Sequence, residues 1–308
     1  MPTLYSHTLD ISYKASICSK AFVFSFVTGV LTFLPPLFIA YRSQGFWQRI
    51  DSYQEQPEIL FKQDCMFLLQ TSNRTNLGWS TFKLFNRFLE SGIRIPLIKT
   101  KENDWNRDGK LDNIDLQITF PLLPKEEILN FEAFLFFDVK LHKLPSVQFE
   151  GLIHLTSNLI DSKTKGIFYV GDFNLIQKEP LRHRGRDSRY NKPYLVDPIS
   201  FSPDNYDFHR ILRTYQTRNL TMRFENIYSS PIHKGKIDTF QIDVLVHFPE
   251  QVILYRPGFW QVLKWGWVQY LSVLLIFLML FRTIKTFVFS KQILHSIQHN
   301  PFLKDKRN

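Results

Sequence analysis

Cysteine is scarce in this chain, because only Cys18 and Cys65 occur among 308 residues. Such a low number excludes a fold held together by a disulfide framework. Only Cys65 lies between the two long apolar runs described below, so the region between them must fold without an internal disulfide. The 30 phenylalanines supply apolar area for such a fold. We expect Cys65 to be a core residue, with intermolecular pairing as the alternative.

The chain also lacks the short motifs that mark common active sites. It contains no G-x-S-x-G, no H-E-x-x-H and no phosphate-binding G-x-x-x-x-G-K. Six histidines lie between the apolar runs without the spacing of metal ligands, namely His142, His154, His183, His209, His233 and His247. We therefore expect no enzymatic activity and no catalytic residue.

Two long apolar runs are present instead. Residues 260–281 read WQVLKWGWVQYLSVLLIFLMLF, and residues 21–41 carry no charged side chain. About 20 such residues span the roughly 30 Å hydrocarbon core of a bilayer. Aromatic residues crowd one end of the later run and Arg282 follows its other end, as is typical of membrane interfaces. We predict two transmembrane helices, the first retained rather than cleaved as a signal peptide, with Pro35 and Pro36 kinking it.

Charge predicts the orientation of these helices. Lys14 and Lys20 precede the first run and a basic tail follows the second, so the positive-inside rule places both termini in the cytoplasm. The predicted organisation is a cytoplasmic segment 1–20, a transmembrane helix 21–41, an extracellular domain 42–259, a transmembrane helix 260–281 and a cytoplasmic tail 282–308. The basic tail then indicates attraction to an anionic lipid bilayer. The net charge of +10 alone could also suit nucleic acid, but a chain anchored twice disfavours that partner.

Three positions are candidates for covalent modification. Asn73 in NRT and Asn219 in NLT are N-glycosylation acceptors, and both fall in the predicted extracellular domain. Cys18 lies beside the predicted first helix. It is expected to be an unmodified thiol, with palmitoylation as the alternative.

The region between the helices is predicted to be rich in β-strands. Side chains alternate between apolar and polar with the period of two of half-buried strands over 114–120, 131–141, 147–155, 167–175, 220–228 and 240–248, and more weakly over 59–69 and 252–255. Phe208, Ile211, Leu212 and Tyr215 follow the spacing of one face of a short helix. The fold class expected is a mainly antiparallel β-sandwich with a short helix, flanked by two transmembrane helices.

The most specific chemical pattern is DWNRDGKLDNID, which starts at Asp104. Its possible ligands are Asp104, Asn106, Asp108, Lys110 through its carbonyl, Asp112 and Asp115, at positions 1, 3, 5, 7, 9 and 12, with Gly109 at position 6. Calcium needs 6 to 8 oxygen ligands, and this spacing resembles that of a calcium-binding loop. Position 12 is Asp rather than the longer Glu, so a β-turn capped by its own Asp and Asn side chains is the alternative.

Short sequences along the chain together resemble the transmembrane protein 231 family. They are CSKA (18–21), Pro35 with Pro36, GFW (45–47), SYQEQP (52–57), WSTF (79–82), FNR (85–87), DGK (108–110), RNLT (218–221), PGFW (257–260) and WVQYLSVLLIFL (267–278). The resemblance implies a non-enzymatic component of the tectonic-like, or Meckel syndrome, complex at the ciliary transition zone. That complex forms a diffusion barrier between ciliary and plasma membranes and is needed for ciliogenesis and hedgehog signalling. The implied partners are the other membrane and membrane-associated subunits of the complex.

Other classes of protein share parts of this pattern. An accessory subunit of a transporter or flippase can have two spans, cytoplasmic termini and a glycosylated extracellular domain. A calcium-dependent adhesion or receptor ectodomain would make use of the Asp104 loop. A two-span ligand-gated channel is disfavoured, because such outer domains are typically rich in disulfides and neither run has a polar face.

Overall fold

The computed structural model describes residues 12–17, 19–43, 48–72, 75–89, 92–124, 126–144, 146–158, 164–187, 189, 194–233 and 238–299. The chain forms two compact units. The helical unit comprises residues 1–49 and 257–308, and the β unit comprises residues 50–256. Both predicted spans belong to the helical unit.

Two long helices make up most of the helical unit. They are α1 (Lys20–Arg42) and α4 (Phe259–Ser290). Ser19 caps the start of α1, because its hydroxyl oxygen accepts the Phe22 amide at 3.2 Å and so satisfies one of the free N–H groups of the first turn. The helix then continues through Pro35 and Pro36 as far as Arg42.

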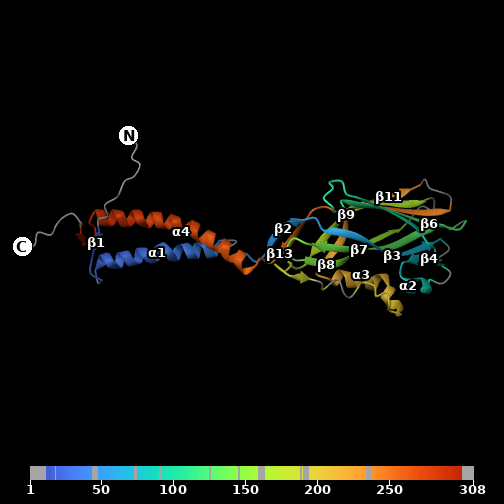
Figure 1. Ribbon diagram of the computed structural model, residues 1–308, viewed down its shortest axis with the longest axis horizontal. Coiled ribbons are helices and arrows are strands. Elements are labelled where there is room, and N and C mark those ends of the chain that lie inside the picture. The colour runs from blue at the N-terminus through green and yellow to red at the C-terminus, as the bar shows by residue number, and fades with distance from the viewer. Residues whose placement is uncertain are drawn as a thin grey trace, which may run out of the picture. The chain divides into compact units, whose positions relative to one another are not determined.

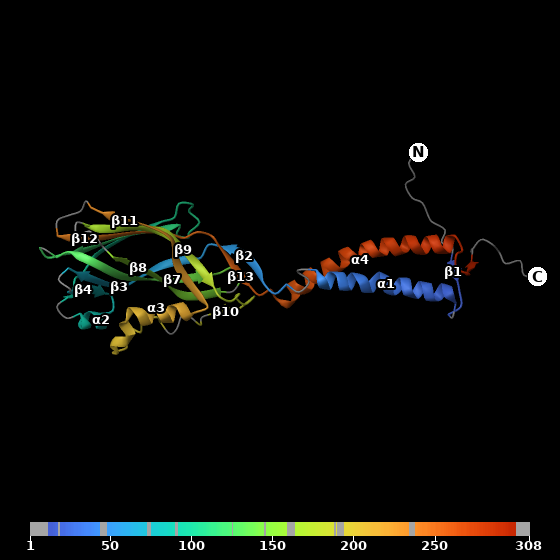
Figure 2. The ribbon, with the colours of Figure 1, turned by 180° about the vertical axis from the view of Figure 1, so that it is seen from behind.

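The two helices lie side by side and antiparallel (Figures 1 and 2). The ring of Phe24 meets Phe289 at 6.2 Å near one end, and the Ser43 hydroxyl donates to Gln269 Oε1 at 3.2 Å near the other. Strands β1 (Ser12–Lys14) and β14 (Ile297–His299) pair beyond the helices. The buried face of α1 repeats every four residues, at Thr28, Thr32, Pro36 and Ala40.

The β unit contains two five-stranded sheets and a separate two-stranded ribbon. One sheet has the order β10-β8-β7-β3-β4, the other has the order β11-β9-β12-β6-β5, and the ribbon pairs β13 with β2. The strands are β2 (Asp51–Glu55), β3 (Glu58–Thr71), β4 (Asn76–Ser80), β5 (Leu97–Asn103), β6 (Asn113–Pro121), β7 (Ile128–Leu141), β8 (Ser146–Asn158), β9 (Gly166–Gln177), β10 (Arg186–Asp187), β11 (Leu220–Ile232), β12 (Thr239–His247) and β13 (Gln251–Tyr255).

These sheets confirm the predicted fold class. Each of the eight stretches predicted as strands forms a strand, and most pairs are antiparallel. The sequence did not predict the two parallel pairs, β12 with β9 and β10 with β8. The short helices are α2 (Lys83–Phe88), a 3-10 turn at Pro203–Tyr206, and α3 (Phe208–Thr217). Helix α3 falls where the apolar spacing predicted a helix.

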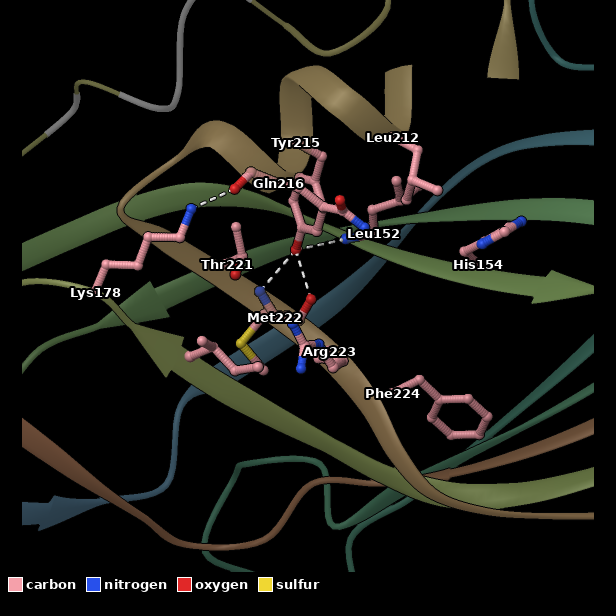
Figure 3. Close-up of a pocket in the computed structure, with 11 residues that line it drawn as sticks. Leu152, His154, Lys178, Leu212, Tyr215, Gln216, Thr221, Met222, Arg223 and Phe224 are labelled. Carbon is pink, nitrogen blue, oxygen red and sulfur yellow. Dashed lines mark hydrogen bonds between the residues drawn. The ribbon is translucent and has the colours of Figure 1, made fainter. Parts of the chain in front are cut away.

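Helix α3 is attached to one strand of each sheet through a single hydroxyl group. The Tyr215 oxygen accepts the amide of Leu152 in β8 at 3.2 Å and the amide of Met222 in β11 at 2.7 Å, and it donates to the Met222 carbonyl at 2.9 Å (Figure 3). Tyr215 is buried, and burial raises the pKa of its hydroxyl to about 12. The hydroxyl therefore stays protonated and acts as a fixed donor.

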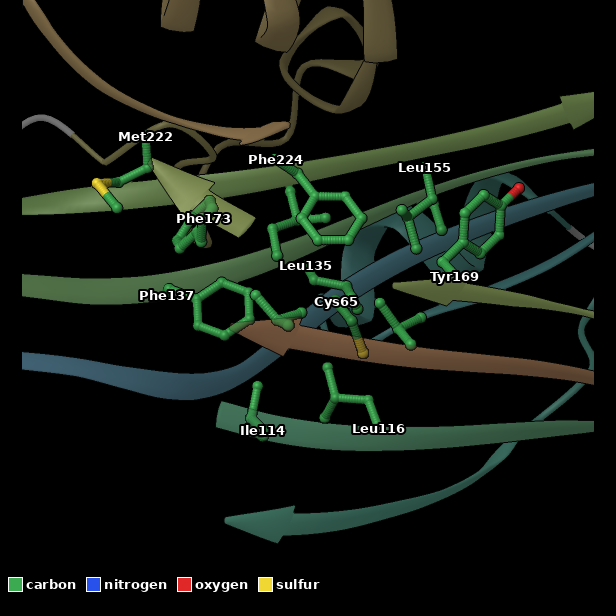
Figure 4. Close-up of a cluster of buried hydrophobic side chains, with 14 of the residues drawn as sticks. Cys65, Ile114, Leu116, Leu135, Phe137, Leu155, Tyr169, Phe173, Met222 and Phe224 are labelled. Carbon is green, nitrogen blue, oxygen red and sulfur yellow. The ribbon is translucent and has the colours of Figure 1, made fainter. Parts of the chain in front are cut away.

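Phenylalanine dominates the core between the two sheets. Phe67, Phe137 and Phe173 are among its fully buried side chains. Figure 4 shows Phe137 and Phe173 together with aliphatic residues of both sheets, such as Leu135 and Leu116. Burial of one such side chain contributes about 1.5–3 kcal/mol. Cys65 also lies in this core with no exposed surface, which confirms that prediction.

A second, smaller cluster lies on the opposite face of the β7 sheet. There Phe134 stacks on Phe208 of α3 with ring centroids 4.5 Å apart, and Phe136 and Leu152 pack beside them. Because both faces of β7 are covered, residues 133–137 are all buried and the alternation of the strand is lost at its centre.

Candidate functional site

The Asp104 loop joins the edge strand β5 to β6. Its turn depends on Gly109, which has a φ of +84° that favours glycine, and on Arg107, which has a φ of 57°. Three oxygen-bearing side chains accept amide protons inside the loop. Asp104 Oδ2 accepts from Gly109 at 3.0 Å, Asn106 Oδ1 from Asp108 at 2.9 Å, and Asp108 Oδ1 from Lys110 at 2.8 Å.

Asp112 ties the two ends of this loop together. Its carboxylate accepts the amide of Trp105 at 2.8 Å and that of Asn106 at 3.3 Å, together with the side-chain amide of Gln56 at 3.3 Å. These donors, the Trp105 amide first, hold the pKa of Asp112 below its ordinary value. The Lys110 ammonium reaches the Gln56 carbonyl at 2.7 Å, so the loop is fastened to the segment that follows β2.

The structure separates Asp115 from the other predicted ligands. Asp115 lies in β6, opposite Lys101 and Leu245. Burial raises the pKa of Asp243 on the neighbouring strand, and the charge of Asp115 raises it further. Asn106 contacts both Asp108 and Asp112, because its side-chain nitrogen lies 3.2 Å from Asp108 Oδ2 and 3.5 Å from Asp112 Oδ1. Among the residues that the structure describes, no three His, Cys, Asp or Glu side chains are grouped as metal ligands. Calcium binding therefore stays a prediction. A bound cation would compete with the backbone amides that donate to the side-chain oxygens of Asp104, Asn106 and Asp108.

The predicted modification sites fall in different places. Asn73 and Cys18 lie outside the described residues. Asn219 is partly exposed between α3 and β11, and its carbonyl accepts the Lys178 amide at 2.9 Å. Thr221 of the same acceptor sequence is buried in β11. Glycosylation at both positions stays a prediction.

Cys65, His142 and His154 make structural contacts. Burial raises the pKa of the Cys65 thiol to about 12, so this thiol is not a nucleophile at neutral pH. His154 bonds Glu132 and His142 bonds Glu58, each at 2.8 Å. The hydrogen bond from His142 is the main cause that lowers the pKa of Glu58. The lack of enzymatic activity remains a prediction.

A cavity of about 440 Å³ lies beside α3, between β8, β9 and β11. Figure 3 shows Tyr215 at its centre, and the Lys178 ammonium donates to the Gln216 carbonyl at its rim. The polar groups around the Tyr215 hydroxyl are therefore bonded to each other. Sequence reasoning identified Tyr215 only as part of an apolar helix face. Nothing in the local pattern indicates its three bonds, because Leu152 is 63 residues away.

Both long helices have the properties of membrane spans. Lys20–Arg42 and Phe259–Ser290 are long and apolar enough to cross a bilayer. Within the pair, large apolar side chains stay uncovered, such as Phe26 at 64% and Met279 at 75% exposure. Exposed apolar area of this extent requires lipid or other apolar helices around it.

Comparisons with known proteins point to one family. The sequence profile of the transmembrane protein 231 family matches residues 1–298. Transmembrane protein 231 of Mus musculus is 38% identical over 301 residues, which cover 96% of this chain and 94% of that protein. The Homo sapiens protein of the same name is 37% identical over 301 residues (96% and 93%), and the Gallus gallus protein is 37% identical over 308 residues (97% and 94%). No solved structure matches the chain.

Proposed function

Since the chain belongs to the transmembrane protein 231 family, whose members are membrane proteins, we propose that it is a non-enzymatic subunit of the tectonic-like complex at the ciliary transition zone. In this role it forms part of a diffusion barrier between the ciliary and plasma membranes and supports ciliogenesis and hedgehog signalling. The observation that carries the proposal is the length of the family match, which extends over residues 1–298 and so includes both the helical unit and the β unit.

The arrangement of each unit is compatible with lateral assembly in a membrane. The helical unit leaves large apolar side chains uncovered on both helices, and these can contact lipid or the helices of other subunits. The β unit supplies a rigid body with its own core. We propose that the β unit is extracellular, that both termini are cytoplasmic, and that an array of such subunits, rather than a catalytic group, slows the diffusion of membrane proteins.

Proximity labelling in ciliated cells tests the location and the partners. A labelling enzyme fused to the full chain should biotinylate tectonic-like complex subunits, and the signal should concentrate at the ciliary base. A fusion of the same enzyme to an unrelated two-helix anchor controls for membrane proximity. Labelling dominated by a transporter or flippase would favour the accessory-subunit alternative and contradict the proposal.

Removal of the protein tests the barrier. Cells that lack it should admit plasma-membrane proteins into the cilium and lose resident ones, and the full chain should restore the composition. Unchanged ciliary membrane composition after removal would contradict a barrier role, even if the location were correct.

A further inference from the structure

The pairing of α1 with α4 places two basic residues opposite the inner part of α1. Phe24 meets Phe289 and Ser43 meets Gln269, so positions along the two helices can be matched. In this antiparallel register, Arg282 of α4 lies at the same position along the helix axis as Leu31 of α1, and Lys285 lies at the same position as Thr28. At 1.5 Å per residue, both basic residues are about 12–16 Å inside the Lys20 end of α1.

No protein carboxylate is present in the helix pair to neutralise these charges. Neither α1 nor α4 contains an Asp or Glu. The ion pairs recorded among the described residues do not include Arg282 or Lys285. A charge at membrane depth is costly unless it reaches an anion or the interface. The two side chains start one turn apart on the same face of α4, so both can reach one group.

A groove of about 540 Å³ lies between the helices at this level. Gly29, Thr32 and Phe33 of α1 form one side, Leu275, Leu278 and Met279 of α4 form the other, and Arg282, Lys285 and Thr286 stand at one end. Gly29 faces the open space of the groove, because a Cβ there would meet no atom within 4 Å. The groove is therefore apolar along its length and basic at one end.

We propose that this groove binds an anionic phospholipid, with an acyl chain along Gly29, Phe33 and Leu275 and with its phosphate held by Arg282 and Lys285. Basic pockets between transmembrane helices are suited to phosphorylated lipid headgroups. The volume is that of a small-molecule site, whereas a partner helix is about 10–12 Å wide and needs a longer face. This inference requires only that the helix pair lies in a bilayer, and it does not depend on the transition-zone role.

Lipid retention by the full chain tests the site. The chain is reconstituted in phosphatidylcholine nanodiscs that contain a phosphatidylinositol phosphate, and the lipids that it retains are measured by native mass spectrometry. Arg282→Gln with Lys285→Gln should lower retention of the anionic lipid about tenfold or more. Lys264→Gln with Lys291→Gln removes the same charge from exposed positions of α4 and its cap, outside the groove, and should change retention less than about twofold.

Gly29→Leu tests the shape of the groove independently of its charge. This variant fills the groove and keeps every basic residue, and its Cβ meets no atom within 4 Å, so it should also reduce retention of the anionic lipid. Circular dichroism should show unchanged helix content in all three variants. Equal loss in both charge variants, with no effect of Gly29→Leu, would mean diffuse attraction to the membrane surface and would overturn the site. Failure of the unmodified chain to prefer the anionic lipid, or cross-linking of Arg282 to an acidic helix of another protein instead, would also overturn it.

Discussion

At the scale of single residues, the Tyr215 hydroxyl holds α3 on the β unit. Its oxygen bonds Leu152 of β8 and both backbone groups of Met222 in β11. Tyr215→Phe leaves two buried amides and one carbonyl without this partner, and we expect a loss of about 1–3 kcal/mol in the free energy of unfolding. Thermal unfolding of the full chain in detergent measures the change, and hydrogen exchange at Leu152 and Met222 should accelerate.

Tyr228→Phe is the matched control for this change. Tyr228 also lies in β11, but it is 62% exposed. Its replacement should leave the melting temperature and the exchange rates unchanged. If both variants were equally stable, the bonds of the Tyr215 hydroxyl would contribute nothing beyond what solvent offers.

Calcium binding would also depend on single side chains, those of the Asp104 loop. If the Asp104 loop binds calcium, Asp104→Asn with Asp108→Asn should abolish the heat of calcium binding in calorimetry of the full chain, because two carboxylate ligands are lost. Asp115→Asn should leave that heat unchanged, since Asp115 lies in β6 beside Asp243. The absence of any calcium heat in the unmodified chain would identify the loop as a turn capped by its own side chains.

At the scale of elements, the parallel pair of β9 and β12 depends on a close approach at Gly166. A Cβ at Gly166 would lie 2.2 Å from the carbonyl oxygen of Gln241, and backbone atoms cannot move aside without separating the strands. We expect Gly166→Ala to cost about 3 kcal/mol of stability, the upper end of the range for overpacking. Denaturant unfolding followed by tryptophan fluorescence measures this cost.

Gly151→Ala provides the comparison. A Cβ there would meet only side-chain atoms of Val139, Phe173 and Met222, at 3.1–3.3 Å. These side chains can shift by a few tenths of an ångström, so the expected cost is nearer 1 kcal/mol. The reverse order of stability would show that β9 and β12 tolerate separation.

Strand prediction succeeded where apolar residues recur with a period of two, in strands with one buried face such as β6 and also in β7, whose two faces are both covered. In β6, burial alternates from Ile114 to Phe120, so the apolar pattern reports the strand directly. The edge strand β5 was missed because almost all of Leu97–Asn103 is exposed and its sequence, LIKTKEN, has no apolar face. Strand β4 was missed because it is short and contains Gly78. The structure requires glycine there, since a Cβ would lie 2.5 Å from the Phe67 carbonyl oxygen.

Features that depend on distant pairing could not be predicted from local patterns. The parallel register of β9 on β12 joins residues about 75 positions apart, and nothing in either segment specifies it. The same holds for the candidate site. Hydropathy ends the second apolar run at Arg282, whereas α4 continues to Ser290, and only its pairing with α1 shows how deep Arg282 lies. In the Asp104 loop, the alternation over 114–120 correctly placed Asp115 in a strand, whereas the bonds from backbone amides to Asp104, Asn106 and Asp108 could not be predicted from the spacing.

At the scale of the whole molecule, three pairings determine how often the chain crosses a membrane. Strands β2 and β13 pair at the two ends of the β unit, where the Tyr255 hydroxyl donates to Asp51 at 2.9 Å. Helices α1 and α4 are antiparallel, and β1 pairs with β14 beyond them. The chain therefore leaves and re-enters the β unit at adjacent points. Strands β1 and β14 also lie side by side, so an even number of crossings is expected.

This arrangement predicts a common location for the two termini, opposite to that of the β unit. Epitopes at the N-terminus, at the C-terminus and in the connection between β8 and β9 can be probed with protease on intact cells. The β8–β9 epitope should be digested while both terminal epitopes survive, because Lys14, Lys20 and Lys291 lie at the terminal ends of the helices and favour the cytoplasm. Permeabilised cells, in which all three epitopes should be digested, provide the control. Survival of one terminal epitope and loss of the other would mean a single crossing, which the pairing of β1 with β14 does not allow. Survival of the β8–β9 epitope with loss of both terminal ones would keep the hairpin but invert it, and it would place Asn219 where no glycan is added.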